Sequence, residues 1–481
     1  LNFFKMSNSK KVGLFLGPIF FLLILLWPQP LLSTQGDALI AVALWMVTWW
    51  LTEAVSISVT ALLPLLLFPL LDIMPIAEVG NNYGSPIIFL FFGGFVMALA
   101  LEKVNLHRRI ALNIIRITGT TPNKVVLGFM IATASLSMWI SNTATVVVML
   151  PIAMSVIKLL IDDVDGFTKK DRNFAVSVLL GIAFSANAGG IATVIGTPPN
   201  SILIGLLENE YQIEISFLKW MVFALPFSII MIGLSYITLV HLIFPSKGLN
   251  FSASNEVIQE ELRKLGPTRS KEKMVLGIFA VTVSLWIFRT LINSVFPSLG
   301  LSDTMISMFA AISLFAVPFN LKKGDFILDW KDTEKLAWGI LILFGGGLAL
   351  AKGMSVSGIV DQVSQSIAAG NFSITATASL LILLMLFMTE LMSNVALVAV
   401  LAPVVAGIAI GLGIPMVYLL IPVTMASSCA FMLPMATPPN AIVFASGFIE
   451  VKDMVKAGIL LNLVAVLILI GLFEYIIPLL F

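Results

Sequence analysis

Long apolar segments recur along the whole chain and are separated by short polar stretches. A helix that crosses a bilayer needs about 20 mostly apolar residues. Runs of this kind cover residues 12–32, 37–71, 85–102, 122–161, 174–208, 217–245, 274–298, 303–319, 336–352, 372–412, 416–449 and 455–481. Several runs are too long for one span, so the pattern predicts an all-α polytopic membrane protein with about 11 transmembrane helices and some shorter pieces.

Two polar stretches are rich in Lys and Arg, which favours a cytoplasmic position for both. The longer one, 246–273, is predicted to be a linker between a first half, 1–245, and a second half, 274–481. The other, 103–124, has apolar residues at helical spacing, and this pattern favours an amphipathic helix in the membrane interface over an ordinary basic loop. These apolar residues are Leu106, Ile110, Ile114 and Ile117.

The composition excludes most other classes of protein. Of the 481 residues, 59% are hydrophobic and 11% are charged, whereas a soluble domain has about 25% charged residues. A soluble enzyme and a nucleic-acid-binding protein are therefore ruled out, and no nucleic-acid partner is expected. An intramembrane enzyme is disfavoured because the apolar segments contain no paired Asp, Ser-His or HExxH arrangement.

Three motifs occur twice in the same order. FGGFVMALAL near residue 92 is repeated as FGGGLALAKG near 344, SNTATVVVMLP at 141 as SNVALVAVLAP at 393, and TPPNSI at 197 as TPPNAI at 437. The first two pairs are displaced by 252 positions (93 to 345 and 141 to 393) and the third by 240 (197 to 437). The difference of 12 matches an extra charged loop, 162–173, so the chain consists of two homologous halves.

The charges that follow the glycine motifs indicate how the two halves are oriented. The segment after the first motif, 103–124, is basic, whereas its counterpart, 353–370, has Asp361 and no Lys or Arg. The positive-inside rule places the two segments on opposite faces of the membrane. The halves are therefore predicted to be inverted repeats, as in many transporters, and this arrangement disfavours a channel.

The Ser-Asn motifs interrupt two long apolar runs, 122–161 and 372–412. A polar break in the middle of such a run predicts a re-entrant hairpin whose tip lies near the bilayer midplane. Ser and Asn are favourable N-caps, so the second arm should begin at the tip and direct its free N–H groups there. Such a helix end attracts anions, and the carbonyl groups that end the first arm suit a cation.

Hydroxyl groups precede both Ser-Asn motifs by four residues, at Ser137 and Thr389. Together with Ser141 and Ser393 they place two hydroxyls on one helix face in each repeat. Oxygen ligands without thiolate or imidazole suit an alkali or alkaline-earth ion. The alternative is that the hydroxyls bond their own helix or join helices; the repetition beside Ser-Asn favours the ion site.

The TPPN motifs break the apolar runs 174–208 and 416–449 into two half-helices each, because two prolines interrupt a continuous helix. The predicted non-helical stretches run from Asn187–Gly190 through Thr197 and from Ala430 to Thr437. Such backbone at membrane depth is tolerated where it is buried or lines a cavity. A simple proline kink is the alternative.

No Lys or Arg lies in these four motifs, and Glu390 is the only acid near a hairpin tip. Glu390 would repel an anion unless it faces away or is neutral. An anionic substrate would therefore need bound cations to supply positive charge. The Trp49-Trp50 pair, followed by Thr52 and Glu53, is interpreted as an anchor at the membrane interface.

With these motifs the chain resembles the divalent anion:sodium symporter family, the INDY-type dicarboxylate transporters. The resemblance rests on Ser141–Thr143, Ser393–Val395 and both TPPN segments, and 430–447 is especially close. It implies a homodimer in the plasma membrane, which in bacteria is the inner membrane. Each subunit would have a scaffold domain and a transport domain that moves as an elevator. It also implies sodium-coupled import of C4-dicarboxylates such as succinate, malate or fumarate.

The resemblance also implies the site residues. A first sodium site would use Ser137, Ser141, Asn142 and backbone near Gly190, and a second would use Thr389, Asn394 and the carbonyls of Met392 and Ala436. The substrate carboxylates would meet Asn142, Thr143, Ser393, Asn394, Thr437 and Pro438. Val395 stands where many bacterial members have Thr, so transport of citrate or another divalent anion stays open. A sodium-independent exchanger also stays open, because the family contains both kinds of transporter and oxygen ligands alone do not guarantee sodium.

Overall fold

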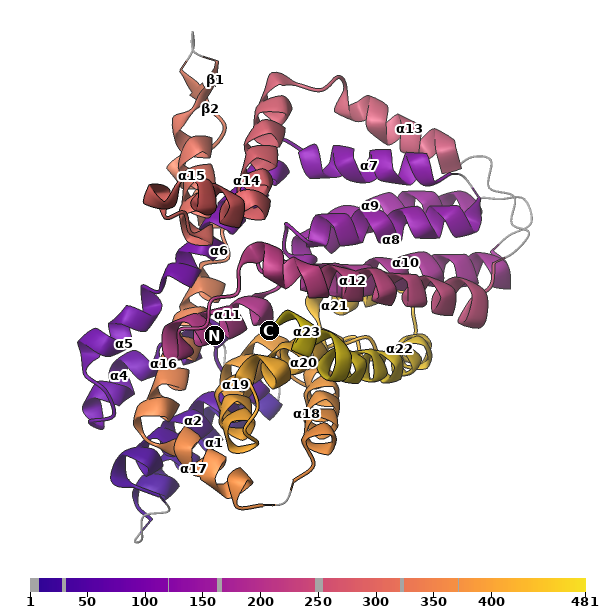
Figure 1. The fold of residues 1–481 in the computed structure, drawn as a ribbon. Coiled ribbons are helices and arrows are strands. Elements are labelled where there is room, and N and C mark those ends of the chain that lie inside the picture. The colour runs from indigo at the N-terminus through magenta and orange to yellow at the C-terminus, as the bar shows by residue number, and fades with distance from the viewer. Residues whose placement is uncertain are drawn as a thin grey trace.

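The computed structural model describes residues 8–27, 32–119, 121–161, 167–246, 254–320, 324–370 and 372–481. The described chain is almost entirely helical (Figure 1). Eight helices in these ranges are long and apolar enough to cross a membrane, and five shorter apolar helices accompany them.

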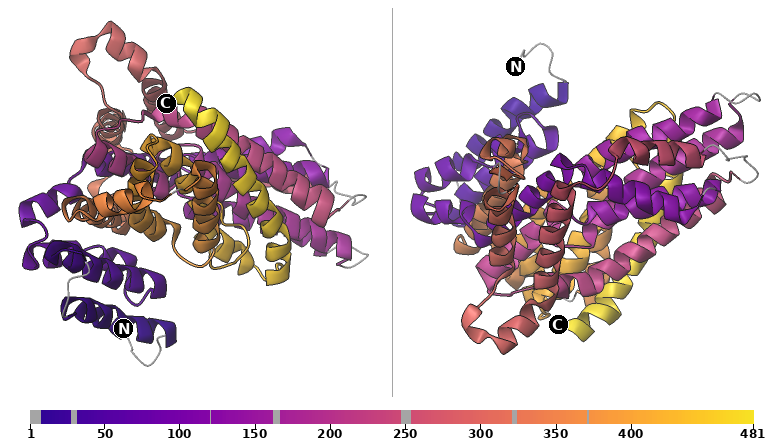
Figure 2. Two further views of the ribbon diagram at one scale, coloured as in Figure 1. Left: turned by 60° about the horizontal axis from the view of Figure 1, so that its bottom comes forward. Right: turned by 90° about the horizontal axis from the view of Figure 1, so that it is seen from above.

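The N-terminal part consists of a pair of long helices followed by three short ones: α1 (Asn8–Leu25), α2 (Thr34–Thr52), α3 (Ile57–Thr60), α4 (Leu63–Leu70) and α5 (Ile76–Tyr83). The first repeat contains α6 (Pro86–Lys103), α7 (Leu106–Thr118), α8 (Pro122–Ser137), α9 (Asn142–Ile161), α10 (Lys169–Ile191), α11 (Pro198–Tyr211) and α12 (Phe217–Tyr236). The α1–α2 pair lies at the edge of the molecule (Figure 2).

Between α12 and α16 lie α13 (Ser254–Leu265), α14 (Ser270–Val295), α15 (Asp303–Ala316) and a small hairpin of β1 (Pro318–Asn320) and β2 (Asp325–Phe326). The second repeat contains α16 (Trp338–Val356), α17 (Ile359–Ala368), α18 (Ile374–Thr389), α19 (Asn394–Gly411), α20 (Met416–Ser427), α21 (Pro438–Phe444), α22 (Val451–Gly471) and α23 (Ile477–Leu480).

The helix boundaries repeat as the motifs do. α8 and α18 have the same length, and both of their ends are displaced by 252 positions (122 to 374 and 137 to 389), as is the start of α9 relative to α19 (142 to 394). The last long helix of each repeat widens into a π-helical turn, Ile237–Ile243 after α12 and Leu472–Ile476 after α22. The equivalent helices α7 and α17 lie at opposite ends of the molecule (Figure 1), as inverted repeats require.

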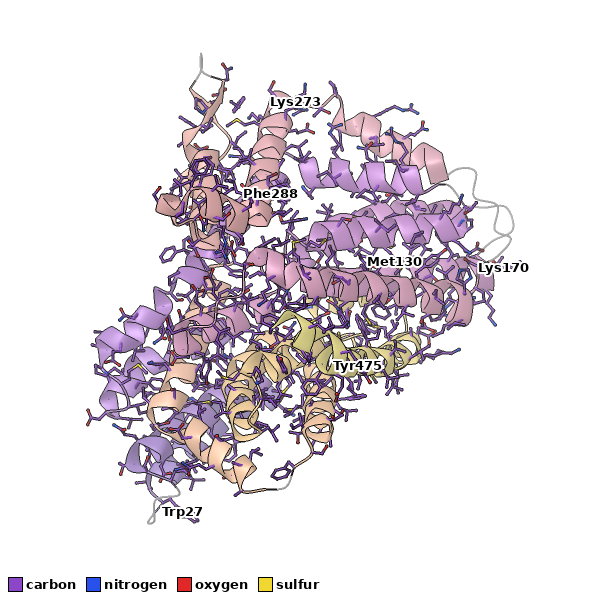
Figure 3. The ribbon with its side chains drawn as sticks, in the orientation of Figure 1. Trp27, Met130, Lys170, Lys273, Phe288 and Tyr475 are labelled. Carbon is purple, nitrogen blue, oxygen red and sulfur yellow. The ribbon has the colours of Figure 1, made fainter. Side chains whose placement is uncertain are left out.

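α10 forms the centre of the molecule. Every residue from Phe174 to Ile191 is buried, and the helix packs against α8, α9 and α12. A helix that is apolar on all sides is stable only where other helices surround it. By contrast, α14 and the C-terminal helices present large apolar side chains on the outer surface, including Phe288 and Tyr475 (Figure 3), as expected for a surface that faces lipid.

The basic stretch 103–124 does contain the expected amphipathic helix, α7. Its buried face includes Leu106, Leu112 and Ile115, whereas Ile117, which the helical spacing assigned to the apolar face, is 79% exposed. The apolar face is thus rotated from the expected one. This rotation directs Arg109 inward, where it pairs with buried Glu272 at 2.5 Å.

The stretch 246–273 is more ordered than a plain linker, although its residues 247–253 lie outside the described ranges. It contains α13 and the start of α14, and α13 packs on α7. Glu261 of α13 pairs with Arg108 of α7. A hydrogen bond from Lys264 and the nearby Arg108 lower the pKa of Glu261, so this contact persists at neutral pH.

The close packing of α10 on α8 predicts a stability difference between two glycine substitutions. A β-carbon at Gly189 would lie 2.6 Å from the carbonyl oxygen of Ala134, whereas one at Gly233 of α12 would meet nothing within 4 Å. We expect Gly189→Ala to destabilise the fold by about 1–3 kcal/mol and Gly233→Ala to be neutral or stabilising by up to about 1 kcal/mol. Thermal unfolding in detergent measures both, and equal midpoints would contradict the packing of α10.

Candidate functional site

Both Ser-Asn motifs lie at hairpin tips. α8 ends at Ser137 and α9 begins at Asn142, while α18 ends at Thr389 and α19 begins at Asn394. The second arm of each hairpin therefore starts at the motif, as expected. Ser141 caps α9 by accepting a hydrogen bond from the Ala144 N–H at 3.3 Å, whereas Ser393 makes no such bond to α19.

Both TPPN motifs follow a helix break, but the first break is shorter than expected. α10 continues to Ile191, so the prediction that the chain unwinds at Asn187–Gly190 is wrong, and the non-helical stretch is only 192–197. The helix persists because Gly189 fits closely against Ala134 of α8, where a larger residue would clash. In the second repeat α20 ends at Ser427, and the non-helical stretch, 428–437, includes all of the expected Ala430–Thr437.

The Asn of each TPPN motif bonds the carbonyl groups that the break leaves free. Asn200 donates from Nδ2 to the carbonyl oxygen of Thr193 at 2.8 Å, with longer bonds to those of Gly190 and Ile191. Asn440 donates to the carbonyl oxygens of Ala430 and Leu433, both at 3.0 Å. In both repeats the acceptors include the residues ten and seven positions earlier, so a single amide stabilises each break.

Asn187 connects the two repeats, a role that the sequence did not indicate. Its Nδ2 lies within hydrogen-bond distance of the carbonyl oxygen of Ala430, Oγ1 of Thr437 and Oδ1 of Asn440, at 3.2, 3.1 and 3.3 Å. The only signal in the sequence was an amide within an otherwise apolar run. Through this side chain α10 holds the second break in place.

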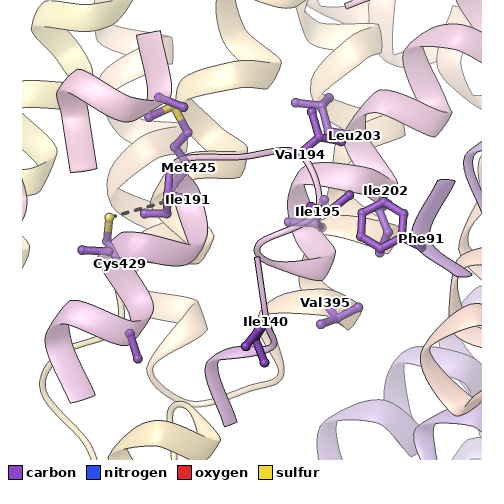
Figure 4. Packing of buried hydrophobic residues seen from close by; sticks show 14 of the residues in the cluster. Phe91, Ile140, Ile191, Val194, Ile195, Ile202, Leu203, Val395, Met425 and Cys429 are labelled. Carbon is purple, nitrogen blue, oxygen red and sulfur yellow. Dashed lines mark hydrogen bonds between the residues drawn. The ribbon is translucent and has the colours of Figure 1, made fainter. Parts of the chain in front are cut away.

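The two tips and the two breaks surround one cavity of about 620 Å³. All six predicted substrate residues line it: Asn142, Thr143, Ser393, Asn394, Thr437 and Pro438. Of the predicted cation ligands, five line it: Ser141, Asn142, Met392, Asn394 and Ala436. Apolar side chains complete the wall, among them Ile195 of the first break and Val395 of the second hairpin (Figure 4).

The other three predicted cation ligands lie behind the cavity wall. Oγ of Ser137 lies 2.5 Å from Oδ1 of Asn142 and 2.8 Å from the carbonyl oxygen of Ala186, and its single proton is available to either acceptor. A β-carbon at Gly190 would lie 2.5 Å from Oδ1 of Asn142, so Gly190 also abuts this side chain.

Thr389 occupies the equivalent place in the second repeat and donates to the carbonyl oxygen of Ser427 at 2.6 Å. Neither Ser137 nor Thr389 bonds the carbonyl four residues earlier in its own helix. Both join their hairpin to the neighbouring broken helix instead.

The end of α2 also contributes to the cavity. Trp50 is 2% exposed and donates to the carbonyl oxygen of Ile57 at 3.0 Å, so the assignment of Trp50 as an anchor at the membrane interface is wrong. Thr52 and Glu53 line the cavity beside it. Glu53 lies 3.4 Å from Lys10 and is the only charged side chain among the described lining residues, which include no Lys, Arg or His.

A cavity between two broken helices, within a bundle of apolar helices, is typical of an integral membrane transporter. The chain matches the family described as sodium:sulfate symporter transmembrane region over residues 8–481, and it belongs to this family.

Sequence identity to known transporters supports membership of this family. The chain is 39% identical to the sodium-dependent dicarboxylate transporter SdcS of Staphylococcus aureus strain USA300, over 99% of this chain and 94% of the relative. It is 40% identical to SdcS of Staphylococcus saprophyticus, over 97% of this chain and 91% of the relative.

Two solved structures share the fold. The YdaH transporter of Alcanivorax borkumensis matches with a TM-score of 0.56 at 13% identity, over 82% of this chain and 86% of that one. MtrF of Neisseria gonorrhoeae matches with a TM-score of 0.50 at 12% identity, over 98% and 95%. At these identities the likeness concerns the fold alone.

The link from α10 to the second break predicts the effect of removing the Asn187 amide. We expect Asn187→Ala to destabilise the protein by about 1–3 kcal/mol, because it leaves buried Oδ1 of Asn440 without its donor and removes the bonds from α10 to the second break. Asn173→Ala is the control, since Asn173 makes one exposed bond to the carbonyl oxygen of Pro245. Thermal unfolding compares the two variants, and equal stability would mean that Asn187 does not hold the break.

Proposed function

We propose that the protein imports a C4-dicarboxylate such as succinate, malate or fumarate, together with sodium ions. One observation carries this proposal: the N-termini of α9 and α19 begin at a shared cavity whose described lining includes no cationic side chain. Helix N-termini attract carboxylates. Because no fixed cation balances the charge of a dianion there, bound cations would have to do so. Both SdcS relatives are sodium-dependent dicarboxylate transporters by name, which supports sodium and a dicarboxylate.

The proposed cation sites flank the cavity symmetrically. The first uses Ser137, Ser141, Asn142 and backbone near Gly190, and the second uses Thr389, Asn394 and the carbonyls of Met392 and Ala436. The oxygens of the first site come from a hairpin tip and the last turn of α10, and those of the second come from a hairpin tip and the break beside it. Hydroxyl, amide and carbonyl oxygens are the hard ligands that sodium prefers. The substrate carboxylates are held by Asn142, Thr143, Ser393, Asn394, Thr437 and Pro438.

The proposal includes an elevator movement of the hairpins and broken helices against the remaining helices. Part of the contact surface between these two groups is apolar and contains small residues. A β-carbon at Gly205 of α11 would lie 2.9 Å from Ile87, and one at Gly347 of α16 would lie 3.0 Å from Ala399. Such a surface lets helices slide with few polar bonds to break.

Several polar contacts between the proposed moving helices and the remaining helices lie at the end of α11 and in its connection to α12. Asn209 bonds Ser85 at 2.9 Å, Glu210 pairs with Lys352 at 3.2 Å, and Glu214 pairs with Arg289 at 2.7 Å. These contacts would have to rearrange in the movement, and they stabilise the conformation seen here.

The remaining parts of the proposal follow from the same family resemblance. The protein would work as a homodimer in the lipid of the bacterial inner membrane and would catalyse no chemical reaction. A sodium-independent dicarboxylate exchanger is the alternative function, and citrate or another divalent anion is the alternative substrate.

Uptake into proteoliposomes separates symport from exchange. We expect labelled succinate to accumulate when an inward sodium gradient is applied and to enter at background rate when choline replaces sodium. Succinate entry that ignores sodium and requires internal dicarboxylate would establish the exchanger instead. Unlabelled malate, fumarate and citrate as competitors then define the substrate.

Substitution of the two tip amides tests the site. We expect Asn142→Ala and Asn394→Ala each to reduce succinate uptake by at least about 100-fold, because each removes a ligand that is shared by substrate and cation. Asn293→Ala, which removes an amide at the far end of α14, should leave uptake intact. Normal uptake by both tip variants, with normal size-exclusion profiles, would mean that the hairpin tips are structural only.

A further inference from the structure

Glu390 is the residue directly after α18, next to the proposed cation ligand Thr389. Its side chain is 3% exposed and turns away from the cavity, which it does not line. Oε1 accepts hydrogen bonds from the N–H groups of Phe431 and Met432 at 2.8 and 2.9 Å, and Oε2 accepts one from the N–H of Leu433 at 3.0 Å. The carboxylate of Glu390 therefore bonds the backbone of the second break and does not face a substrate in the cavity.

A fourth donor completes this network. Nδ2 of Asn462, a fully buried residue of α22, donates to Oε1 of Glu390 at 2.7 Å. All four partners within the described chain are N–H donors, and a carboxylate anion is the group that accepts from such a set. One buried carboxylate thus accepts hydrogen bonds from three consecutive backbone N–H groups, which have no helical carbonyl partner because the chain is not helical here.

These three N–H groups belong to the non-helical stretch 428–437. Within it, Leu433 accepts from the Ala436 N–H at 3.2 Å and from Nδ2 of Asn440 at 3.0 Å. The position of Ala436, whose carbonyl is a proposed ligand of the second cation, therefore depends on Leu433. Leu433 in turn is held by Glu390.

The first repeat has no counterpart to this carboxylate. The position 252 residues before Glu390 is Met138, whose carbonyl oxygen accepts from Oγ1 of Thr193 at 2.5 Å. The first break spans six residues, 192–197, and the second spans ten, 428–437. A longer non-helical stretch has more free N–H groups to satisfy, and only the second repeat uses a charged side chain for this purpose.

We propose that Glu390 is a positioning residue for the second cation site: it holds the stretch 428–437 so that the Ala436 carbonyl faces the cavity, and its negative charge favours cation binding there. The inference rests on the proposed function and adds that the two cation sites are unequal. Removal of the charge raises the sodium concentration that transport requires, without changing how the substrate is recognised at saturating sodium.

The test is the sodium dependence of succinate uptake by Glu390→Gln in proteoliposomes. Gln keeps the size of Glu but removes the charge and one acceptor. We expect the half-saturating sodium concentration to rise at least about tenfold, because hydrogen bonds to a charged group are lost, while the KM for succinate at saturating sodium stays within about twofold. Glu334→Gln, the same change at an exposed residue, serves as the control and should match the wild type.

A second variant covers the case in which Glu390→Gln does not fold. Asn462→Ala removes one of four donors and leaves the carboxylate, so a smaller rise of about threefold in the half-saturating sodium concentration is expected. An unchanged sodium response in whichever variant folds, beside wild-type uptake that depends on sodium, would overturn this inference alone. Wild-type uptake that ignores sodium would overturn the proposed function as well. A parallel rise of the succinate KM at saturating sodium would show a general structural role instead.

Discussion

Backbone groups at membrane depth must find their hydrogen-bond partners within the protein, and the rest of this structure depends on how two helix breaks meet that requirement. The breaks create the cavity because they expose the ends of half-helices inside an apolar bundle. Asn200 and Asn440 satisfy carbonyl groups at equivalent places in the two repeats. Glu390 satisfies N–H groups in the second break alone. The symmetry of the site therefore comes from the repeat, and its asymmetry comes from one acidic residue.

The low number of charged residues has two consequences, one for the outer surface and one for the cavity. Few charged residues allow the helices to contact lipid, and the same scarcity leaves the cavity without a cationic side chain among its described lining residues. A dianion bound there would interact with helix N-termini, hydroxyls and amides, none of which supplies a full charge. Coupling to cations is then a physical consequence of how the site is built, and it explains why a transporter with this cavity would use a sodium gradient.

Most of the architecture could be predicted from the sequence because motif spacing records the repeat directly. Both hairpins and both TPPN breaks were found in this way, whereas the six proposed substrate residues came from the family resemblance and stay predictions. The errors have one physical origin, since they concern which neighbour a segment contacts. Gly189 packs on Ala134 of α8, Trp50 is buried beside the cavity, and the polar face of α7 pairs with acidic residues of α13 and α14. The bonds of Asn187 link residues about 250 positions apart, and local periodicity contains no information on such contacts.

Equilibrium binding of succinate to the purified protein, with sodium replaced by choline at constant ionic strength, tests most directly whether this anion site depends on bound cations. No gradient or movement is needed, so the measurement reports on the site itself. We expect succinate to bind in sodium and to lose at least about 100-fold in affinity in choline, because the charge of the dianion is then uncompensated. Equal affinity for succinate in sodium and in choline would contradict this expectation.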